Sequence, residues 1–181
     1  MNLQEAEAFF KSYYGSTYLM DAESHAVYDA YEELGVSAEQ EDLWRAELAD
    51  DLLSKMMGDP DNAGSRVAAI VDVVGDMRTG FVDPMKALSD KLEWMLTCNA
   101  LNHRQRILVL EAMAGSGRED GGIRLAMKAP MLRDRYKRLV VALADFNCEP
   151  SDSGNVPGWT NASARYDNAV AACRLAFKRF A

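Results

Sequence analysis

Two pairs of carboxylates at helical spacing are the residues of this sequence best suited to chemistry. Asp29 stands three positions before Glu32, and Glu47 three positions before Asp50, which places each pair on one face of a helix. Two such pairs on adjacent helices can hold Mg²⁺ against a triphosphate. The apolar stripes of both helices predict that the pairs point outward in a monomer, so only a dimer stacking these faces would complete the site.

The spacing of histidine and cysteine favours no other catalytic or metal site. His25 and His103 fall in different predicted helices, and neither lies in an HExxH or ExxH pattern. The three cysteines are 50 and 25 residues apart, which fits neither a disulfide framework nor paired metal ligands. We therefore expect no catalytic residue, no metal ligand and no cofactor.

The elements that must position these residues are helices. Apolar residues recur at spacings of three and four, and runs with strand-like alternation do not occur. The pattern predicts an all-α fold, a compact single-domain bundle of about seven or eight helices. Capping residues, glycine and proline place the helices at residues 3–14, 21–34 (or 24–34, with Ser24 as the start), 38–57, 67–79, 84–98, 103–113, 130–146 and 163–181, with a short segment at 123–128 and a long loop at 147–162. Asn102 and Gln105 have the spacing of a reciprocal cap for the helix at 103–113, which is apolar on nearly all sides and is expected to be central.

The composition fits one domain spanning residues 1–181. Hydrophobic residues make up 49% of the chain and charged residues 27%, which excludes the disordered and coiled-coil classes. No apolar run approaches the ~20 residues that a membrane-spanning helix needs, and the N-terminus lacks the basic and apolar regions of a secretion signal. We therefore expect a cytoplasmic protein.

The formal charge of −8 is distributed unevenly along the chain. The predicted acidic helices, residues 1–61, hold 15 Asp and Glu against 3 Lys and Arg. The predicted basic helices, residues 102–146, hold 5 Asp and Glu against 9 Lys and Arg. Charge separation of this kind bears on partners and on association rate rather than on fold.

The acidic helices predict a surface that competes with nucleic acid. A dense array of carboxylates can imitate the phosphates of a nucleic-acid backbone and occupy a basic channel that normally holds it. The candidate partner-binding carboxylates are Asp29, Glu32, Glu33, Glu39, Asp42, Glu47, Asp50 and Asp51. The alternative is that these residues form the solvated faces of ordinary amphipathic helices.

Three cations of the basic helices, Arg133, Lys137 and Arg138, are further candidates for partner contact. They can form salt bridges to the acidic helices, or touch RNA that a partner already holds. In the long loop, Trp159 is either an exposed binding residue or the anchor that pins the loop to the bundle.

Three aromatic-rich segments carry a family resemblance. Residues 9–15 (FFKSYYG), 18–21 (YLMD) and 44–47 (WRAE) resemble the start of small helical proteins of bacterial mobile elements, among them anti-CRISPR proteins. The resemblance covers the first third of the chain and rests on aromatic packing residues. We expect a core cluster there, made of Phe9, Phe10, Tyr13 and Tyr14 with the neighbouring Tyr18 and Met20. It implies a non-enzymatic inhibitor of a Cas9-type nuclease with its guide RNA, whose positively charged guide–target channel is open to an acidic competitor.

A second resemblance supplies an alternative function. Residues 47–52 (ELADDL) resemble the second metal-binding motif of all-α nucleoside triphosphate pyrophosphohydrolases. The first motif of that family would begin at Asp29, where a glutamate is usual. The alternative function that this resemblance implies is Mg-dependent hydrolysis of nucleoside triphosphates.

A third reading is a helix-turn-helix DNA-binding regulator. Residues 101–111 (LNHRQRILVLE) look like the first helix of that motif. Gly121 and Gly122 stand where the recognition helix should begin, and the turn before them is longer than the usual three or four residues.

The final predicted helix carries an apolar stripe at nearly heptad spacing. The stripe consists of Tyr166, Val170, Cys173, Phe177 and Phe180. Such a stripe either caps the bundle or pairs with a second copy of itself, which would make the protein a homodimer.

Overall fold

A computed structural model describes residues 1–56, 58–115, 121–145 and 162–180. Within these ranges the chain forms ten α-helices and one short 3-10 helix, and no strand. The α-helices are α1 (Leu3–Ser12), α2 (Thr17–Glu23), α3 (His25–Leu34), α4 (Ala38–Met56), α5 (Ala63–Gly75), α6 (Val82–Thr97), α7 (His103–Ala114), α8 (Gly122–Met127), α9 (Pro130–Ala144) and α10 (Ala162–Arg179), and the 3-10 helix η1 is Pro60–Asn62. The all-α prediction is confirmed.

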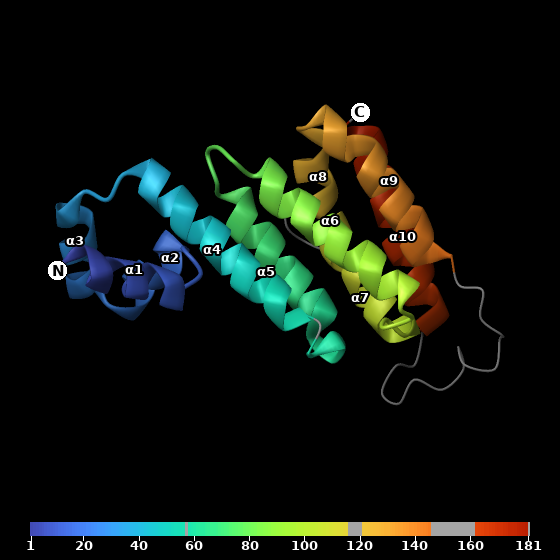
Figure 1. Ribbon diagram of the computed structural model, residues 1–181, viewed down its shortest axis with the longest axis horizontal. Coiled ribbons are helices and arrows are strands. Elements are labelled where there is room, and N and C mark those ends of the chain that lie inside the picture. The colour runs from blue at the N-terminus through green and yellow to red at the C-terminus, as the bar shows by residue number, and fades with distance from the viewer. Residues whose placement is uncertain (57, 116–120, 146–161, 181) are drawn as a thin grey trace.

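The helices follow one another along the long axis of the molecule (Figure 1). Helices α1, α2 and α3 form one end, which also holds the N-terminus. Helices α4 and α5 lie side by side next to them and lead to α6 and α7. Helices α8, α9 and α10 form the opposite end. Helices α1 to α3 of the predicted acidic segment and helices α8 and α9 of the predicted basic segment therefore lie at opposite ends of the protein. The two segments meet in the middle, where Gln105 donates a hydrogen bond to Asp61 at 2.7 Å.

The predicted count of seven or eight helices is too low because the sequence does not predict α2 as a helix of its own and predicts α8 only as a short segment. The backbone of Ser24 is extended, with φ of −157°, and this residue separates α2 from α3. Ser16 begins α2 by accepting a hydrogen bond from the backbone N–H of Leu19 at 3.4 Å. Helix α3 ends, as predicted, at Gly35, whose φ of 64° is a left-handed conformation that suits glycine.

The predicted cap of the central helix is confirmed. The Asn102 side chain accepts a hydrogen bond from the Gln105 backbone N–H, and the Gln105 side chain accepts one from the Asn102 backbone N–H. This reciprocal pair satisfies two backbone donors at the start of α7. Helix α7 is buried on several sides and packs mainly against α5 and α10.

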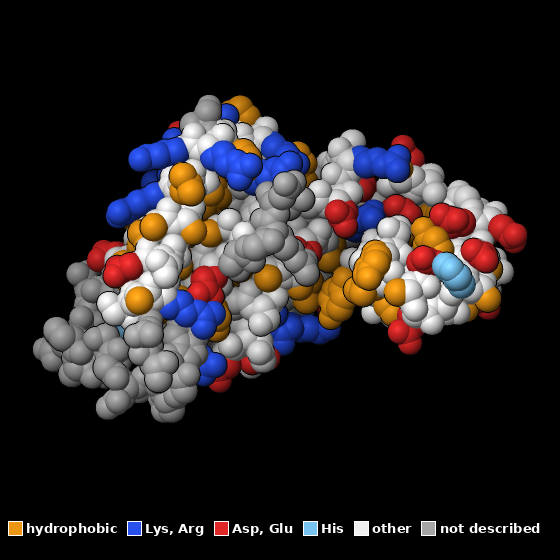
Figure 2. Space-filling model, turned by 180° about the vertical axis from the view of Figure 1, so that it is seen from behind, with side chains coloured by type: hydrophobic (Ala, Val, Ile, Leu, Met, Phe, Trp, Pro, Cys, Tyr) orange, Lys and Arg blue, Asp and Glu red, His pale blue; other side chains and the backbone are white. Residues whose placement is uncertain are grey.

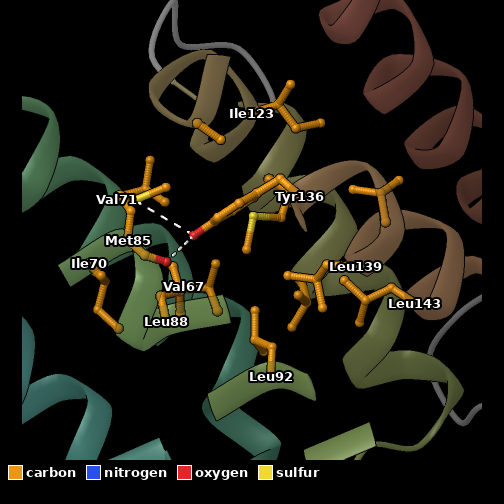
Figure 3. Packing of buried hydrophobic residues seen from close by; sticks show 14 of the residues in the cluster. Val67, Ile70, Val71, Met85, Leu88, Leu92, Ile123, Tyr136, Leu139 and Leu143 are labelled. Atoms are coloured by element: carbon orange, nitrogen blue, oxygen red, sulfur yellow. Dashed lines mark hydrogen bonds between the residues drawn. The ribbon is translucent and has the colours of Figure 1, made fainter. Parts of the chain in front are cut away.

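The main core is aliphatic and is built by α4 to α10. Tyr136 of α9 is fully buried in it, and its hydroxyl donates a hydrogen bond to the Met85 carbonyl of α6 at 2.7 Å (Figure 3). Side chains from α5, α6, α8 and α9 surround the ring, including Val71, Leu88 and Ile123. The hydrogen bond satisfies the one polar atom that this side chain brings into the core.

Helices α5 and α7 approach closely at Gly64. A Cβ atom at this position would lie 2.4 Å from the Cβ atom of Leu108 and 2.9 Å from its backbone carbonyl carbon. Only glycine fits between the two helix backbones at this distance. The position therefore fixes how α5 and α7, the most extensive helix pair in the protein, pack together.

A smaller aromatic cluster holds α1, α2 and α3 against α4. Its buried members are Ala6, Phe10, Met20, Tyr31, Trp44, Leu48 and Val73. The prediction that Phe10 and Met20 are core residues is confirmed, because both are fully buried. The same prediction is wrong for Tyr14 and Tyr18, which are exposed.

Helix α10 uses its apolar stripe within the chain. Val170 and Cys173 are buried in the main core, and Tyr166, Phe177 and Phe180 pack against it. Burial raises the pKa of the Cys173 thiol to about 12. Of the two predicted uses of the stripe, the structure shows capping of the bundle. Packing within the chain accounts for this stripe, so the stripe by itself does not support a homodimer.

Candidate interaction surface

Helix α3 and the outer face of α4 carry most of the predicted acidic surface. On α3, Asp29, Glu32 and Glu33 are exposed. On α4, exposed carboxylates occur at Glu39, Glu47, Asp50 and Asp51. Figure 2 shows acidic side chains gathered over this end of the molecule. The structure thus brings seven of the eight predicted carboxylates to the surface.

Asp42 is the exception, and its assignment to the exposed acidic surface is wrong. It is buried, with 7% of its surface exposed. Its carboxylate accepts hydrogen bonds from the backbone N–H groups of Arg78 and Thr79, at 3.2 and 2.9 Å, and from the Thr79 hydroxyl at 3.2 Å. Asp42 therefore holds the loop between α5 and α6 against α4.

A buried polar network positions α3 and the start of α4. The Tyr31 hydroxyl donates to Glu41 at 2.7 Å, and Glu41 accepts a second hydrogen bond from Arg45 at 3.2 Å. Arg45 also donates to the Gly15 carbonyl at 3.3 Å, and its guanidinium lies 4.8 Å from the centroid of the Phe10 ring. Burial and the bond to Glu41 raise the pKa of Tyr31. One arginine thus ties the turn after α1 to α4.

The exposed carboxylates differ in whether a cation lies beside them. Lys11 of α1 pairs with Glu47, and Lys55 pairs with Asp51 one helical turn away. Within the described residues, Asp29, Glu33 and Asp50 have no ion pair. Their charges are compensated by solvent and salt, and so they are available to a cationic partner.

The backbone favours the charged form of Glu39 at the start of α4. Its side chain accepts hydrogen bonds from its own backbone N–H and from the Ser37 hydroxyl, and these lower its pKa. The first turn of a helix also carries partial positive charge, which favours a carboxylate. Glu39 therefore stays ionised at neutral pH.

The carboxylate pairs of the pyrophosphohydrolase alternative face solvent, as the apolar stripes predict. Asp29, Glu32, Glu47 and Asp50 are all exposed, and Glu47 is engaged by Lys11. Among the residues that the structure describes, no group of three or more His, Cys, Asp or Glu side chains lies close enough together to hold a metal ion.

The predicted cations of α9 have different surroundings. Arg138 is exposed, Lys137 lies 3.9 Å from Asp134, and Arg133 donates to the Met127 carbonyl at 3.3 Å. The ion pairs that reach across the fold from this end join Arg135 to Asp90 and Glu93 of α6, and Arg165 to Glu111 of α7. The predicted salt bridge from these cations to the acidic helices is wrong, because among the described residues no ion pair joins Arg133, Lys137 or Arg138 to residues 1–61.

The remaining sequence predictions concern α8 and the long loop. Helix α8 has six residues and buries five of them, with Arg124 as the partly exposed one. It therefore lacks an exposed face with which to enter a DNA groove, so the structure gives no support to a helix-turn-helix reader.

Trp159 lies outside the described residues, as does most of the predicted loop.

Sequence reasoning missed a groove between α9 and α10. It has a volume of about 580 Å³, and Val140, Val141, Val170 and Phe177 provide most of its apolar lining. The one indication of the groove in the sequence was Val141, an apolar residue that lies between the buried Leu139 and Leu143 of α9. In the structure 69% of its surface is exposed. Periodicity alone does not distinguish such a residue from a core residue.

Comparison of the chain with protein-family models, with curated proteins and with solved structures finds no match. The resemblance of residues 9–15, 18–21 and 44–47 to anti-CRISPR proteins therefore stays a prediction. Two surfaces of the protein bear on its function: the exposed carboxylates of α3 and α4, and the groove between α9 and α10.

Proposed function

We propose that this protein acts by binding, and that its acidic end occupies a positively charged surface of an enzyme that handles nucleic acid, such as a Cas9-type nuclease. The observation that carries the proposal is the set of exposed carboxylates on α3 and α4, several of which lack a cation partner within the described residues. A protein channel that holds nucleic acid is lined with Lys and Arg, and closely spaced carboxylates can replace the phosphates there.

The local charge balance supports this proposal. Residues 1–37, which contain α1 to α3, hold seven Asp and Glu against one Lys. Binding to a basic channel would neutralise these like charges and so relieve their mutual repulsion. The same electrostatic attraction accelerates encounter at low salt and weakens as salt screens it.

The packing of α3 on the aromatic cluster also favours a binding role. Tyr31 is buried on its inner face, while Asp29, Glu32 and Glu33 are exposed. The aromatic cluster and the Arg45 network hold this helix in place before any partner arrives. A preorganised surface loses less conformational entropy on binding than a flexible acidic segment would.

The test is co-purification with a guide-loaded Cas9-type nuclease at about 0.1 M and about 0.5 M salt, because the Debye length shortens over this range. We expect association at low salt that is largely lost at high salt. Combined substitution D29N, E32Q and E33Q on α3 should weaken it strongly. D134N with D167N, two exposed carboxylates of the opposite end, is the control for altered net charge and should leave association unchanged.

Substituting a buried and an exposed aspartate of α4 tests stability and binding separately. Asp42→Asn removes part of a buried hydrogen-bonded carboxylate and should lower the free energy of unfolding by about 1–2 kcal/mol without weakening association. Asp50→Asn should weaken association and leave stability unchanged. Lack of association at low salt, or association that the α3 substitutions do not affect, would contradict the proposed function.

A further inference from the structure

The groove between α9 and α10 lies at the opposite end of the molecule from the acidic surface. Besides its apolar residues it is lined by Lys137, Arg174 and Lys178, and Asp145 is its one acidic residue. Figure 2 shows Lys and Arg side chains over this end, with hydrophobic side chains exposed between them. The groove thus combines an apolar floor with cationic walls.

The groove exists because α10 packs mainly on α7. Val170 and Cys173 of α10 are buried there, and the Cys173 thiol lies 3.3 Å from the Leu110 carbonyl oxygen. Contact between α10 and α9 is slight and is fixed at one end, where the Tyr166 hydroxyl donates to the Ala144 carbonyl at 2.6 Å. The two helices run antiparallel (Figure 1), and the groove lies between them.

The cations of the groove are spaced to flank a bound chain. Arg174 and Lys178 are one turn apart on the exposed side of α10, and Lys137 stands on α9. Neither Arg174 nor Lys178 has an ion pair among the described residues. The end formed by residues 122–145 and 163–180 holds ten Lys and Arg against three Asp and Glu. The groove therefore favours an anionic occupant.

The apolar floor decides which anionic occupant fits. Val140 and Val170 are buried at the base of the groove, and the half-buried Phe177 and the exposed Val141 provide most of its accessible apolar surface. Such a surface matches the apolar face of an amphipathic helix. Single-stranded nucleic acid is held instead by exposed aromatic rings on which bases stack. Here the two lining rings, Tyr166 and Phe177, are partly buried, and the Tyr166 hydroxyl is used within the chain.

We propose that the groove between α9 and α10 binds an acidic amphipathic helix of a partner protein. The apolar face of that helix lies on Val140, Val170 and Phe177, and its Glu and Asp side chains reach Lys137 on one side and Arg174 and Lys178 on the other. Such a helix would add a third member to the α9–α10 pair. The groove is thus a second binding surface, independent of the acidic end.

The test is fluorescence anisotropy with the full chain and a labelled synthetic peptide of about 20 residues, long enough to be helical in water. The probe carries leucine at positions i, i+4, i+7 and i+11 and glutamate on both flanks. A second peptide has lysine in place of each glutamate. We expect saturable binding of the glutamate peptide and at least tenfold weaker binding of the lysine peptide.

Substitutions locate the binding. Arg174→Glu with Lys178→Glu, and separately Val141→Glu at the exposed edge of the floor, should each weaken binding at least tenfold. All three positions are exposed, and circular dichroism would verify that the variants fold. Arg78→Glu with Lys86→Glu makes the same change in net charge at two exposed positions outside the groove and should change binding less than twofold.

Three results would overturn the proposal: no binding of the glutamate peptide, equal binding of both peptides, or binding that the groove substitutions leave unchanged. A single-stranded RNA oligonucleotide that binds the full chain and loses affinity in R174E/K178E, when the glutamate peptide does not bind, would make this groove a nucleic-acid interface instead.

Discussion

The aromatic cluster at the N-terminal end and the main core are stabilised in different ways. The main core buries aliphatic side chains from seven helices and admits polar atoms such as the Tyr136 hydroxyl, which is satisfied by one hydrogen bond. The aromatic cluster is smaller and depends on a few large rings around a buried arginine. It follows that single polar contacts matter more at the acidic end than in the rest of the protein.

Helix α4 connects the two regions. Its first half contributes Trp44 and Leu48 to the aromatic cluster, and its second half contributes Leu52, Leu53 and Met56 to the main core. The acidic surface lies on the outside of α4 and on α3, and it is thus supported by the smaller of the two clusters. The comparison predicts that the acidic end opens more easily than the centre of the bundle.

The largest expected effect is at Tyr136 in the main core. Tyr136→Ala removes a fully buried ring and should lower the free energy of unfolding by about 3–5 kcal/mol, measured by urea denaturation. Tyr136→Phe keeps the ring and loses only the hydrogen bond to Met85, which should cost about 1 kcal/mol. If both variants lost the same amount, packing would not be what stabilises this core.

A smaller and more local effect is expected at Arg45. Arg45→Met keeps an unbranched side chain but leaves Glu41 and the Gly15 carbonyl without their cation, at a cost of about 2–3 kcal/mol. Amide hydrogen exchange in α1 to α3 should accelerate roughly 30- to 140-fold, since about 1.4 kcal/mol corresponds to a factor of ten.

Amide hydrogen exchange outside α1 to α3 tests whether the aromatic cluster of the Arg45→Met variant opens independently of the main core. Amides of α7, at the centre of the main core, should exchange in the Arg45→Met variant as slowly as in the original protein. Equal acceleration in α7 would show that both clusters unfold together, and the comparison between them would then fail.

The smallest expected effect is a change in alkaline stability from Tyr31. Its pKa is raised in the folded protein by burial and by Glu41, while an unfolded tyrosine ionises near pH 10. The raised pKa therefore adds its full contribution to the free energy of unfolding below about pH 10. This contribution is lost as the pH rises above about 10, because the unfolded tyrosine ionises while the folded one does not. Between pH 9 and pH 11, Tyr31→Phe should lose about 1 kcal/mol less stability than the original protein.

Urea denaturation at the two pH values checks the prediction for Tyr31. Tyr18→Phe is the matched control, because Tyr18 is 79% exposed and should leave the pH dependence unchanged. If Tyr31→Phe lost as much stability between the two pH values as the original protein, the buried Tyr31–Glu41 contact would not contribute to it.

Local patterns accounted for most of the helices but not for all of their boundaries. The capping residues Asn102 and Gln105, and Gly35 in its left-handed conformation, placed the ends of α7 and α3 correctly. Ser24 was one of the two predicted starts of α3, but the separate helix α2 was missed because only one of its seven residues, Met20, is buried and it therefore has no apolar stripe. Signals of this kind act between residues a few positions apart, so they can be recognised in the sequence.

The sequence by itself determined that this protein is all-α and that its charge is divided along the chain. Only the tertiary structure decided that Asp42 is buried while Asp50 on the same helix is exposed, because a loop 36 residues away covers Asp42. The groove between α9 and α10 likewise depends on the packing of α10 against α7. Burial and grooves arise from contacts between residues distant in the sequence, and these contacts leave no periodic pattern in it.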